Sequence, residues 1–336
     1  MSDKQPIPVI CAANEAYAMP MAVMLTSLVC NLKSNRDVDI YIIESGIPLA
    51  LQQKIEVSIL QNKKGSYRLD IHWFKLDMSV IKDLPVRGHV VHITSEAYAR
   101  FLAPDLLPAS YKRAVYLDSD LVVLADIALL YDAMDDQHII AAVANVFLPY
   151  VSSLYFHSTK AVVFDYAERG IPPTNRYFGS GVLVINLDLW RERKITPRIL
   201  EYLEDNKEEV FYHDQGGLNA ILHDQWLRLD QRWNQTTTAL YPQRWQSPGY
   251  TREDWRQTKN DPFIVHYTGI DKPWNPGFAR PRASYFYRYY KKTLFKNELK
   301  ISRVEYIIGF RAYYRLWKAK NWLRALVSER KSQDSP

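Results

Sequence analysis

Cysteine is almost absent from this sequence: the 336 residues include only Cys11 and Cys30, both in an apolar N-terminal stretch. Two cysteines exclude a disulfide scaffold and favour a reducing compartment. No apolar run approaches the roughly 20 residues that a membrane-spanning helix needs. The N-terminus also lacks a hydrophobic segment behind a basic flank, so we expect no secretory signal peptide. These absences predict a cytoplasmic protein.

Internal repeats and low-complexity segments are also missing, which argues against a repeat architecture. Hydrophobic residues make up 47% of the chain and charged residues 24%, which is ordinary for a folded soluble protein. The length suits one large domain or two small ones with a sizeable core. Aromatic residues are plentiful, with 23 Tyr and 9 Trp, and sugar-handling proteins are one class that uses aromatic platforms.

Charge is unevenly distributed along the chain. Residues 280–331 hold 15 Lys and Arg against 3 Asp and Glu, whereas the remaining residues hold 28 against 34. A mildly acidic body followed by a strongly basic tail indicates two parts with different tasks.

Short apolar segments alternate with helical patterns along the chain. Strands are expected at residues 8–13, 38–44, 69–76, 115–117, 139–145 and 262–266, and residues 177–187 are expected to form a glycine-bracketed loop followed by a strongly apolar strand. Helices are expected at residues 20–32, 49–60, 94–102, 125–133, 196–209 and 213–222. This alternation predicts an α/β layer with a mostly parallel sheet, whose ligand lies beyond the carboxyl ends of the strands. Residues 146–176 look irregular, which is typical of a binding loop or lid.

Two aspartates, Asp118 and Asp120, stand at the end of the strand expected at 115–117 and interrupt an apolar stretch. Carboxylates in that position must be exposed, paired or bound to a cation, because burying an unpaired charge is too costly. At positions i and i+2 of a turning chain, both can reach one divalent ion, which would bring a phosphate-bearing substrate with it. The pattern alone is weak evidence, since Asp37-Val-Asp39 repeats it with no role that we can assign.

Other polar residues have an ordinary interpretation beside the functional one. Arg100 on its expected helix is either a solvated residue or a contact to phosphate or sugar. The glycines of residues 177–187 either let a ligand approach the backbone or make a plain tight turn. Asp214 and Gln215, at the start of a helix, could serve only as capping groups. A strand-end histidine such as His266 is more often a structural hydrogen-bonding residue than a ligand.

Six segments in this order carry a more specific signal. They are AANEAYA at residues 12–18, AYAR at 97–100, YLDSD at 116–120, YFGSGVLVIN at 177–186, DQGGLN at 214–219 and HYTGIDKPW at 266–274. Together they resemble glycosyltransferase family 8 over roughly residues 8–275, and in particular its bacterial lipopolysaccharide galactosyl- and glucosyltransferases. The resemblance implies the GT-A fold of nucleotide-diphospho-sugar transferases, with a mostly parallel central sheet and flanking helices. It also implies a retaining, metal-dependent enzyme with a nucleotide-sugar donor.

The resemblance implies a role for each matching side chain. Asp118, Asp120 and His266 would hold the metal, and Lys272 would neutralise the donor diphosphate as a point charge. A site that mixes carboxylates with an imidazole suits Mn²⁺ better than Mg²⁺, which favours all-oxygen shells. The uracil and ribose of UDP and its diphosphate would lie against Ala12, Ala13, Asn14, Tyr17, Ser119 and Gly269. The transferred sugar would lie against Arg100, Gly179, Ser180, Asp214 and Gln215.

Two positions depart from the family pattern. The family usually has an aspartate where this chain has Asn14, whose amide oxygen still accepts a hydrogen bond from a base N–H, with less selectivity. The family also has an asparagine where this chain has Gly179, so one hydrogen bond to the donor sugar is lost. The choice between galactose and glucose therefore stays open.

The expected reaction moves a hexose from a UDP-sugar to a hydroxyl group of a surface-glycan acceptor, a glycan or glycolipid, with retention at the anomeric carbon. Its candidate catalytic residues are Arg100, Asp214 and Gln215. Gln215 lies where the family places a nucleophile, but an amide is a poor one and Asp214 is chemically better. We favour attack on the same face of the sugar, assisted by the departing phosphate. The alternatives are a glycogenin-like protein glucosyltransferase and a noncatalytic module that binds nucleotide sugars or polyanions.

The basic tail adds an expectation about location. We divide the chain into a catalytic domain, residues 1–279, and a basic amphipathic tail, residues 280–336, that associates with the inner face of the cell membrane. On a helix, one stripe would hold Ile307, Phe310, Tyr314 and Trp317. Such a stripe suits an anionic membrane surface, although it could instead pack on the catalytic domain. Nucleic acid would use the same cations, but no upstream motif supports it, and we expect no nucleic-acid partner.

Overall fold

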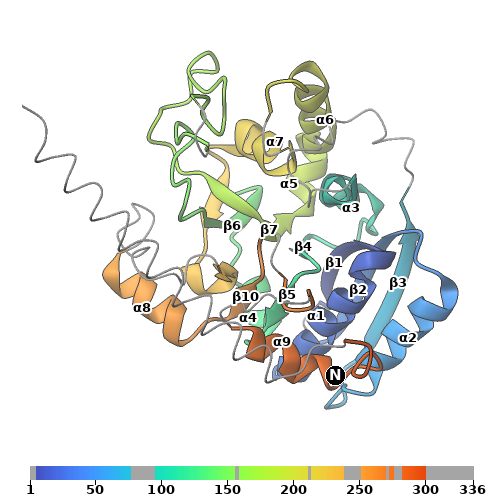
Figure 1. Cartoon of the computed structure of the whole chain (residues 1–336). Helices are drawn as coiled ribbons and strands as arrows, with labels where there is room; N and C mark the ends of the chain where they lie inside the picture. Colours follow the sequence, from blue (N-terminus) through green and yellow to red (C-terminus); the bar gives the residue numbers. More distant parts are fainter. Residues whose placement is uncertain are drawn as a thin grey trace, which may run out of the picture.

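The computed structural model describes residues 5–76, 95–155, 159–210, 213–237, 251–269, 272–275 and 282–299. Within these ranges, seven strands form one sheet in the order β3-β2-β1-β4-β7-β6-β8, with helices on both of its faces (Figure 1). The strands are β1 (Ile7–Asn14), β2 (Val38–Ser45), β3 (Leu69–Lys75), β4 (Arg113–Leu117), β6 (Ile140–Ala144), β7 (Phe178–Asn186) and β8 (Trp226–Arg228). Of these, β7 alone runs antiparallel to its neighbours. The mostly parallel α/β sheet predicted from the sequence is confirmed.

A second, smaller sheet lies beside the first (Figure 1). Its strands are β5 (Leu121–Val123), β10 (Ile264–His266) and β9 (Gln235–Thr236), in the order β5-β10-β9. The sequence pattern predicts apolar segments at β5 and β10 but does not predict that they pair. Their pairing is what brings the two ends of the candidate site together.

The helices follow the predicted alternation. The α-helices are α1 (Ala18–Asn31), α2 (Leu49–Leu60), α3 (Ala99–Leu106), α4 (Ile127–Tyr131), α5 (Leu187–Glu192), α6 (Ile195–Asp205), α7 (His213–Leu222), α8 (Arg252–Asn260) and α9 (Ala283–Tyr290). Short 3₁₀ helices are η1 (Glu15–Tyr17), η3 (Ser95–Tyr98) and η4 (Gln231–Asn234). Pro20 lies in the first turn of α1, where its missing N–H costs no helical hydrogen bond.

Several helices differ from the predicted bounds: α1 begins two residues before the expected start at residue 20, and α6 ends at Asp205, four residues before the expected end at residue 209. The helix expected at 94–102 is the 3₁₀ helix η3 followed by α3, which continues to Leu106. The helix expected at 125–133 is shorter, because Asp126 ends the preceding extended segment and its side chain accepts a hydrogen bond from the N–H of Ala128. Such an N-cap fixes where a helix begins.

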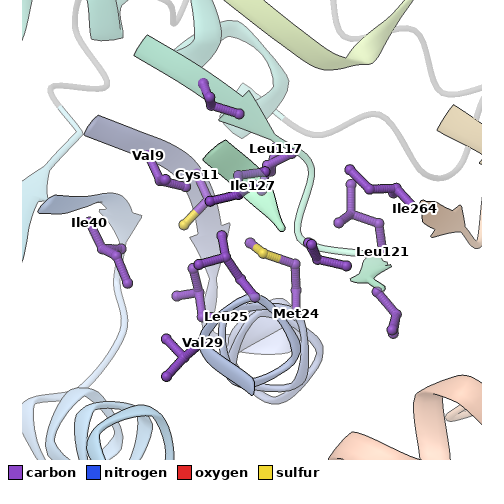
Figure 2. Packing of buried hydrophobic residues seen from close by; sticks show 14 of the residues in the cluster. Val9, Cys11, Met24, Leu25, Val29, Ile40, Leu117, Leu121, Ile127 and Ile264 are labelled. Carbon is purple, nitrogen blue, oxygen red and sulfur yellow. The ribbon is translucent and has the colours of Figure 1, made fainter. Parts of the chain in front are cut away.

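The core lies on both faces of the large sheet, and β1 shows why. Its side chains alternate between the faces: Val9 and Cys11 pack into one apolar cluster, whereas Ile10 packs into the other. Figure 2 shows the first cluster, in which α1 places Met24 and Leu25 against this face. Strands buried on both faces read as continuous apolar runs, which is what the sequence shows here. Burial raises the pKa of Cys11 far above its usual value, so its thiol is a core group.

The first part of the predicted tail packs against the body of the protein. Phe286 and Tyr289 of α9 are buried in the same cluster as α1, and Asn31 Nδ2 donates to the Tyr289 hydroxyl at 2.7 Å. Residues 282–299 therefore pack on the body of the protein, which does not test the two alternatives for the stripe itself. The stripe from Ile307 to Trp317 lies outside the described residues. Within the described ranges, no helix is long and apolar enough to cross a bilayer.

Candidate active site

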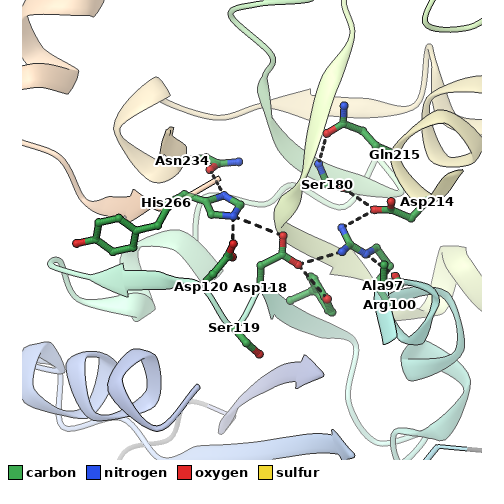
Figure 3. Close-up of polar contacts among 12 residues, drawn as sticks. Ala97, Arg100, Asp118, Ser119, Asp120, Ser180, Asp214, Gln215, Asn234 and His266 are labelled. Atoms are coloured by element: carbon green, nitrogen blue, oxygen red, sulfur yellow. Dashed lines mark hydrogen bonds and ion pairs between the residues drawn. The ribbon is translucent and has the colours of Figure 1, made fainter. Parts of the chain in front are cut away.

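The two aspartates and the histidine of the predicted metal site lie side by side where β4 ends (Figure 3). His266 Nε2 is 2.9 Å from Asp120 Oδ1 and 3.6 Å from Asp118 Oδ2. The small sheet brings them together, because β10 pairs with β5 in a register that sets His266 opposite Leu121. The N–H of Tyr267 also donates to the carbonyl oxygen of Asp120 at 3.0 Å. Each of the three side chains can thus offer one ligand atom within 4.8 Å of the others.

Asn234, at the end of η4, fixes the orientation of His266. Its Oδ1 lies 2.9 Å from His266 Nδ1 in a buried contact (Figure 3). Because an amide oxygen accepts, Nδ1 carries the hydrogen and the lone pair of Nε2 faces the two aspartates. Sequence reasoning missed Asn234, since a single polar residue after a tryptophan carries no recognisable signal.

Removing the Asn234 amide should weaken metal binding. Asn234→Leu leaves the Nδ1–H of His266 without an acceptor, so we expect the affinity for Mn²⁺ to fall about tenfold, at the low end of the effect of losing such a partner. Asn234→Asp keeps an acceptor oxygen and should keep most of the affinity. Calorimetric titration of both variants with Mn²⁺ checks this. Equal affinities of Asn234→Leu and the parent protein would contradict it.

Lys272 and His266 both contact the Asp120 carboxylate. Lys272 Nζ forms an ion pair with this carboxylate and also donates to the carbonyl oxygen of Tyr267 at 2.8 Å. Burial by itself raises the pKa of Asp120, but Lys272 and His266 outweigh it and hold that pKa well below its usual range. Burial lowers the pKa of Lys272, but the Asp120 carboxylate more than offsets this and raises it. Both groups are therefore charged at neutral pH, as binding of a cation and an anionic diphosphate would require.

Arg100 connects the candidate metal ligand Asp118 to Asp214, which was expected to contact the sugar. Its guanidinium pairs with Asp118 Oδ1 at 3.0 Å and with Asp214 Oδ2 at 2.9 Å, while Nε donates to the carbonyl oxygen of Ala97 at 2.8 Å. Burial would lower the pKa of Arg100, but the two carboxylates outweigh it and raise that pKa. Arg100 is 5% exposed, so the interpretation as a solvated helix residue is wrong. The Tyr116 hydroxyl also donates a hydrogen bond to Asp118 Oδ1, at 3.1 Å.

Asp214 and Gln215 turn their side chains toward β7. Asp214 Oδ2 accepts a hydrogen bond from Ser180 Oγ at 2.8 Å and pairs with Arg100. Gln215 Oε1 accepts from the N–H of Ser180 at 3.2 Å. These contacts lie outside the backbone of α7, so a role as capping groups does not account for either residue. Figure 3 shows the resulting chain of contacts.

The glycine-bracketed segment lies within strand β7 and is not a loop before it. Gly181 is the tight position: a Cβ placed there would lie 2.5 Å from Asp118 Oδ2 and 3.0 Å from His266 Nδ1. Its carbonyl oxygen also accepts a hydrogen bond from the N–H of Asp118 at 2.9 Å. Gly179 is less confined, since a Cβ there would meet Asn234 Nδ2 at 3.4 Å. Gly181 therefore leaves room for two metal-site side chains, a function that the sequence predicted only as approach to a ligand.

The residues expected to hold the nucleotide surround the end of β1. Ser119 Oγ donates to the carbonyl oxygen of Ala12 at 2.6 Å, which ties the aspartate turn to β1. Asn14 Oδ1 caps η1 by accepting from the N–H of Tyr17 at 3.3 Å. The Tyr17 ring meets the Trp274 ring edge-on at 6.1 Å between centroids. Ala13, the neighbour of Ala12, is buried.

The turn after β10 sets Lys272 against both aromatic rings. Lys272 Nζ lies 5.9 Å from the ring centroids of Tyr17 and of Trp274. Gly269 in this turn has a φ of +82°, a conformation that glycine adopts without steric cost. The predicted metal, nucleotide and sugar residues thus occupy one continuous region. Its two carboxylates and one imidazole suit a hard to borderline divalent cation.

Comparisons with known proteins agree with this geometry. The pattern of glycosyl transferase family 8 matches residues 8–276. General stress protein A of Bacillus subtilis (strain 168) is 30% identical over 291 residues, which cover 85% of this chain and 93% of that protein. Lipopolysaccharide 1,2-glucosyltransferase of Escherichia coli (strain K12) is 28% identical over 275 residues, which cover 80% of this chain and 73% of that protein.

The fold has relatives among solved structures. The galactosyltransferase LgtC, solved in complex with donor and acceptor sugar analogs, has a TM-score of 0.68 at 20% identity, covering 90% of this chain and 100% of that one. This likeness shows that the two chains share the GT-A fold. Because the family pattern spans most of the sequence, the chain belongs to glycosyl transferase family 8.

Proposed function

We propose that this glycosyltransferase moves a hexose, galactose or glucose, from a UDP-sugar to a hydroxyl group of a lipopolysaccharide-type acceptor, with retention. One observation carries the proposal: Arg100 links the candidate metal ligand Asp118 to Asp214, one of the residues expected to contact the transferred sugar. The diphosphate and the sugar belong to one donor molecule, so the residues that bind each of them must be neighbours. The similarity to a lipopolysaccharide glucosyltransferase supports the class of acceptor.

At the diphosphate end, Asp118, Asp120 and His266 would hold a divalent cation, with Mn²⁺ favoured over Mg²⁺ because one ligand is an imidazole. When bound, the cation supplies stabilisation of the negative charge on the departing UDP. Lys272 supplies a second positive charge from a buried position, where a charge acts more strongly than in water. Asn234 keeps His266 in the tautomer that can bind a cation.

At the sugar end, the contacts favour attack from the same face as the leaving group. Asp214 Oδ2 is engaged by Arg100 and by Ser180 Oγ, which lowers its nucleophilicity. Gln215 already accepts from the Ser180 N–H, and an amide oxygen is a poor nucleophile. We therefore assign these residues to orienting the sugar, while the departing phosphate takes the proton of the acceptor hydroxyl. A glycosyl-enzyme adduct trapped on Asp214 or Gln215 would contradict this mechanism.

The proposed location is the inner face of the cell membrane. The described part of the protein ends with residues 291–299, and the basic segment 300–336 follows it directly. A lipid-linked acceptor would be presented at such a surface, where basic and aromatic residues bind anionic headgroups.

The test of the proposed function is release of UDP from a panel of UDP-sugars, measured with Mn²⁺, with Mg²⁺ and with EDTA. We expect release from one UDP-hexose, fastest with Mn²⁺ and lost with EDTA, because removing the cation removes the charge that stabilises the leaving group. Measuring both release with a glycan acceptor and slow hydrolysis without one separates an enzyme from a binding module. No release from any donor, together with no binding of UDP in the presence of Mn²⁺, would refute the proposal.

A further inference from the structure

Lys272, the buried cation of the candidate site, stands in a segment that helix α9 contacts at two points. The segment follows β10, which ends at His266, and its described residues are 267–269 and 272–275. By its position in the sequence, α9 belongs to the part of the chain that the charge pattern predicts to be a basic tail. The two contacts link this part of the chain to the candidate diphosphate site.

The first contact is between the start of α9 and Tyr267. The Tyr267 hydroxyl donates to the carbonyl oxygen of Arg282 at 2.8 Å and accepts from the N–H of Phe286 at 3.2 Å. Tyr267 is fully buried, and its own carbonyl oxygen accepts from Lys272 Nζ at 2.8 Å. One tyrosine therefore connects α9 to the Lys272 ammonium group.

The second contact is between the middle of α9 and the turn formed by residues 272–275. A hydrogen bond from the N–H of Asn275 to the carbonyl oxygen of Lys272 closes this turn at 3.0 Å. The Tyr287 hydroxyl donates to the carbonyl oxygen of Pro273 within the turn at 2.7 Å. Burial raises the pKa of Tyr287 to about 12, so the hydroxyl keeps its hydrogen at neutral pH and can donate it.

Aromatic packing adds to the second contact. The Trp274 ring lies 5.2 Å from the Phe286 ring of α9, measured between centroids. The same tryptophan meets Tyr17 edge-on, and aromatic pairs at such separations stabilise their packing beyond the area that they bury. Trp274 thus contacts both α9 and one of the residues expected to hold the nucleotide.

The Lys272 side chain needs support from its backbone. Lysine carries a point charge on a flexible stem, and Lys272 is paired with Asp120. A divalent cation bound by Asp120 would compete with Lys272 for that carboxylate. The place of the ammonium group in the donor complex therefore depends on what holds the turn that carries it.

We propose that Tyr287 is a positioning residue, which holds the 272–275 turn so that the Lys272 ammonium meets the donor diphosphate. Tyr267 and Trp274 fix the same segment, but the Tyr287 hydroxyl can be removed with little change in packing. The inference rests on the proposed role of Lys272 toward a UDP-sugar. It adds that α9 belongs to the donor site.

The test compares two tyrosines of α9, each of which loses only its hydroxyl group in the full chain. Tyr287→Phe removes the donor to Pro273. Tyr289→Phe, the matched control, removes the acceptor of the 2.7 Å hydrogen bond from Asn31 Nδ2 of α1. We expect Tyr287→Phe to weaken binding of UDP at saturating Mn²⁺ by about fivefold, as the loss of one hydrogen bond implies, without weakening binding of Mn²⁺ alone. Tyr289→Phe should change neither affinity, and calorimetric titrations measure both.

Two further measurements examine how Tyr287 acts. Hydrogen exchange of the ligand-free protein should show the N–H of Asn275 exchanging about fivefold faster in Tyr287→Phe, because the turn that protects it opens more often. Tyr289→Phe should leave this exchange unchanged. Adding Tyr287→Phe to Lys272→Met should not weaken UDP binding further, since a residue that acts through Lys272 has no effect once the ammonium group is gone.

Several results would overturn the proposal. One is an equal UDP affinity of Tyr287→Phe and the parent protein, and another is an equal loss in Tyr289→Phe, which would indicate a general loosening of α9. A further loss in the double variant would show that Tyr287 does not act through Lys272. A parent protein that binds no UDP would refute the proposed function. Exchange of the Asn275 N–H would still decide whether Tyr287 holds the turn, and an unchanged rate in Tyr287→Phe would show that it does not.

Discussion

Asp120→Asn is expected to lower UDP release from the donor by about 10³-fold and to abolish measurable binding of Mn²⁺. The substitution keeps the shape of the side chain and removes the negative charge that Lys272 and His266 contact. A bound cation contributes several kcal/mol of stabilisation to the leaving charge, and each 1.36 kcal/mol corresponds to a factor of ten in rate. Calorimetry with Mn²⁺ and the UDP-release assay measure the two effects separately.

The chain offers a matched control in its other Asp-Xaa-Asp sequence. Asp37 lies just before β2 and accepts a hydrogen bond from the N–H of Arg68 at 2.8 Å. Asp37→Asn should leave both Mn²⁺ binding and UDP release unchanged, because this residue does not belong to the site. If Asp120→Asn kept the Mn²⁺ affinity of the parent protein, the assignment of the metal site would be wrong.

Gly181→Ala is expected to lower UDP release by about 10²-fold with a parallel loss of Mn²⁺ affinity. The added Cβ would lie 2.5 Å from Asp118 Oδ2 and closer still to the ring of His266. Both side chains would have to move, and a displacement of about 1 Å in such a site costs on the order of 100-fold in rate. Overpacking should also lower the free energy of unfolding by about 1–3 kcal/mol, which a denaturant titration measures.

The control for this prediction is Gly179→Ala in the same strand. A Cβ at residue 179 would meet Asn234 Nδ2 at 3.4 Å, an ordinary contact, so Mn²⁺ affinity should stay close to that of the parent protein. Equal Mn²⁺ affinities of the Gly181 and Gly179 variants would show that the metal ligands can shift without cost, contrary to the expectation.

Much of the fold could be predicted because it is determined by local patterns. The helix predicted at 49–60 has those bounds in the structure, and the strand predicted at 38–44 is β2 with one further residue. The third expected strand, at 69–76, is β3. Apolar runs of β-branched residues and helical periodicity are properties of short windows of sequence. The three short strands β5, β8 and β9 were missed, because segments of two or three residues carry too little pattern.

Some residues of the candidate site could likewise be recognised in the sequence, and others only in the structure. Asp118 and Asp120 stand out in the sequence because two charges interrupt an apolar stretch, and His266 because it ends a short apolar one. Asn234 carries no such mark, and Gly181 is marked only as a glycine that could let a ligand approach. The importance of Asn234 arises from its contact with His266, 32 positions away, and that of Gly181 from the room it leaves for His266 and Asp118. Such residues meet only in the folded protein.

The sequence by itself determined the α/β alternation, the family and the residues that could hold a cation, because all of these depend on residue type and order. The tertiary structure decided which charges meet. It placed Arg100 between the carboxylates of Asp118 and Asp214 and paired Lys272 with Asp120, because a buried charge needs a partner of opposite charge. It also decided that residues 282–299 pack on the protein body. An amphipathic aromatic pattern is the same for a helix on a protein core and a helix on lipid, so only the fold could distinguish them.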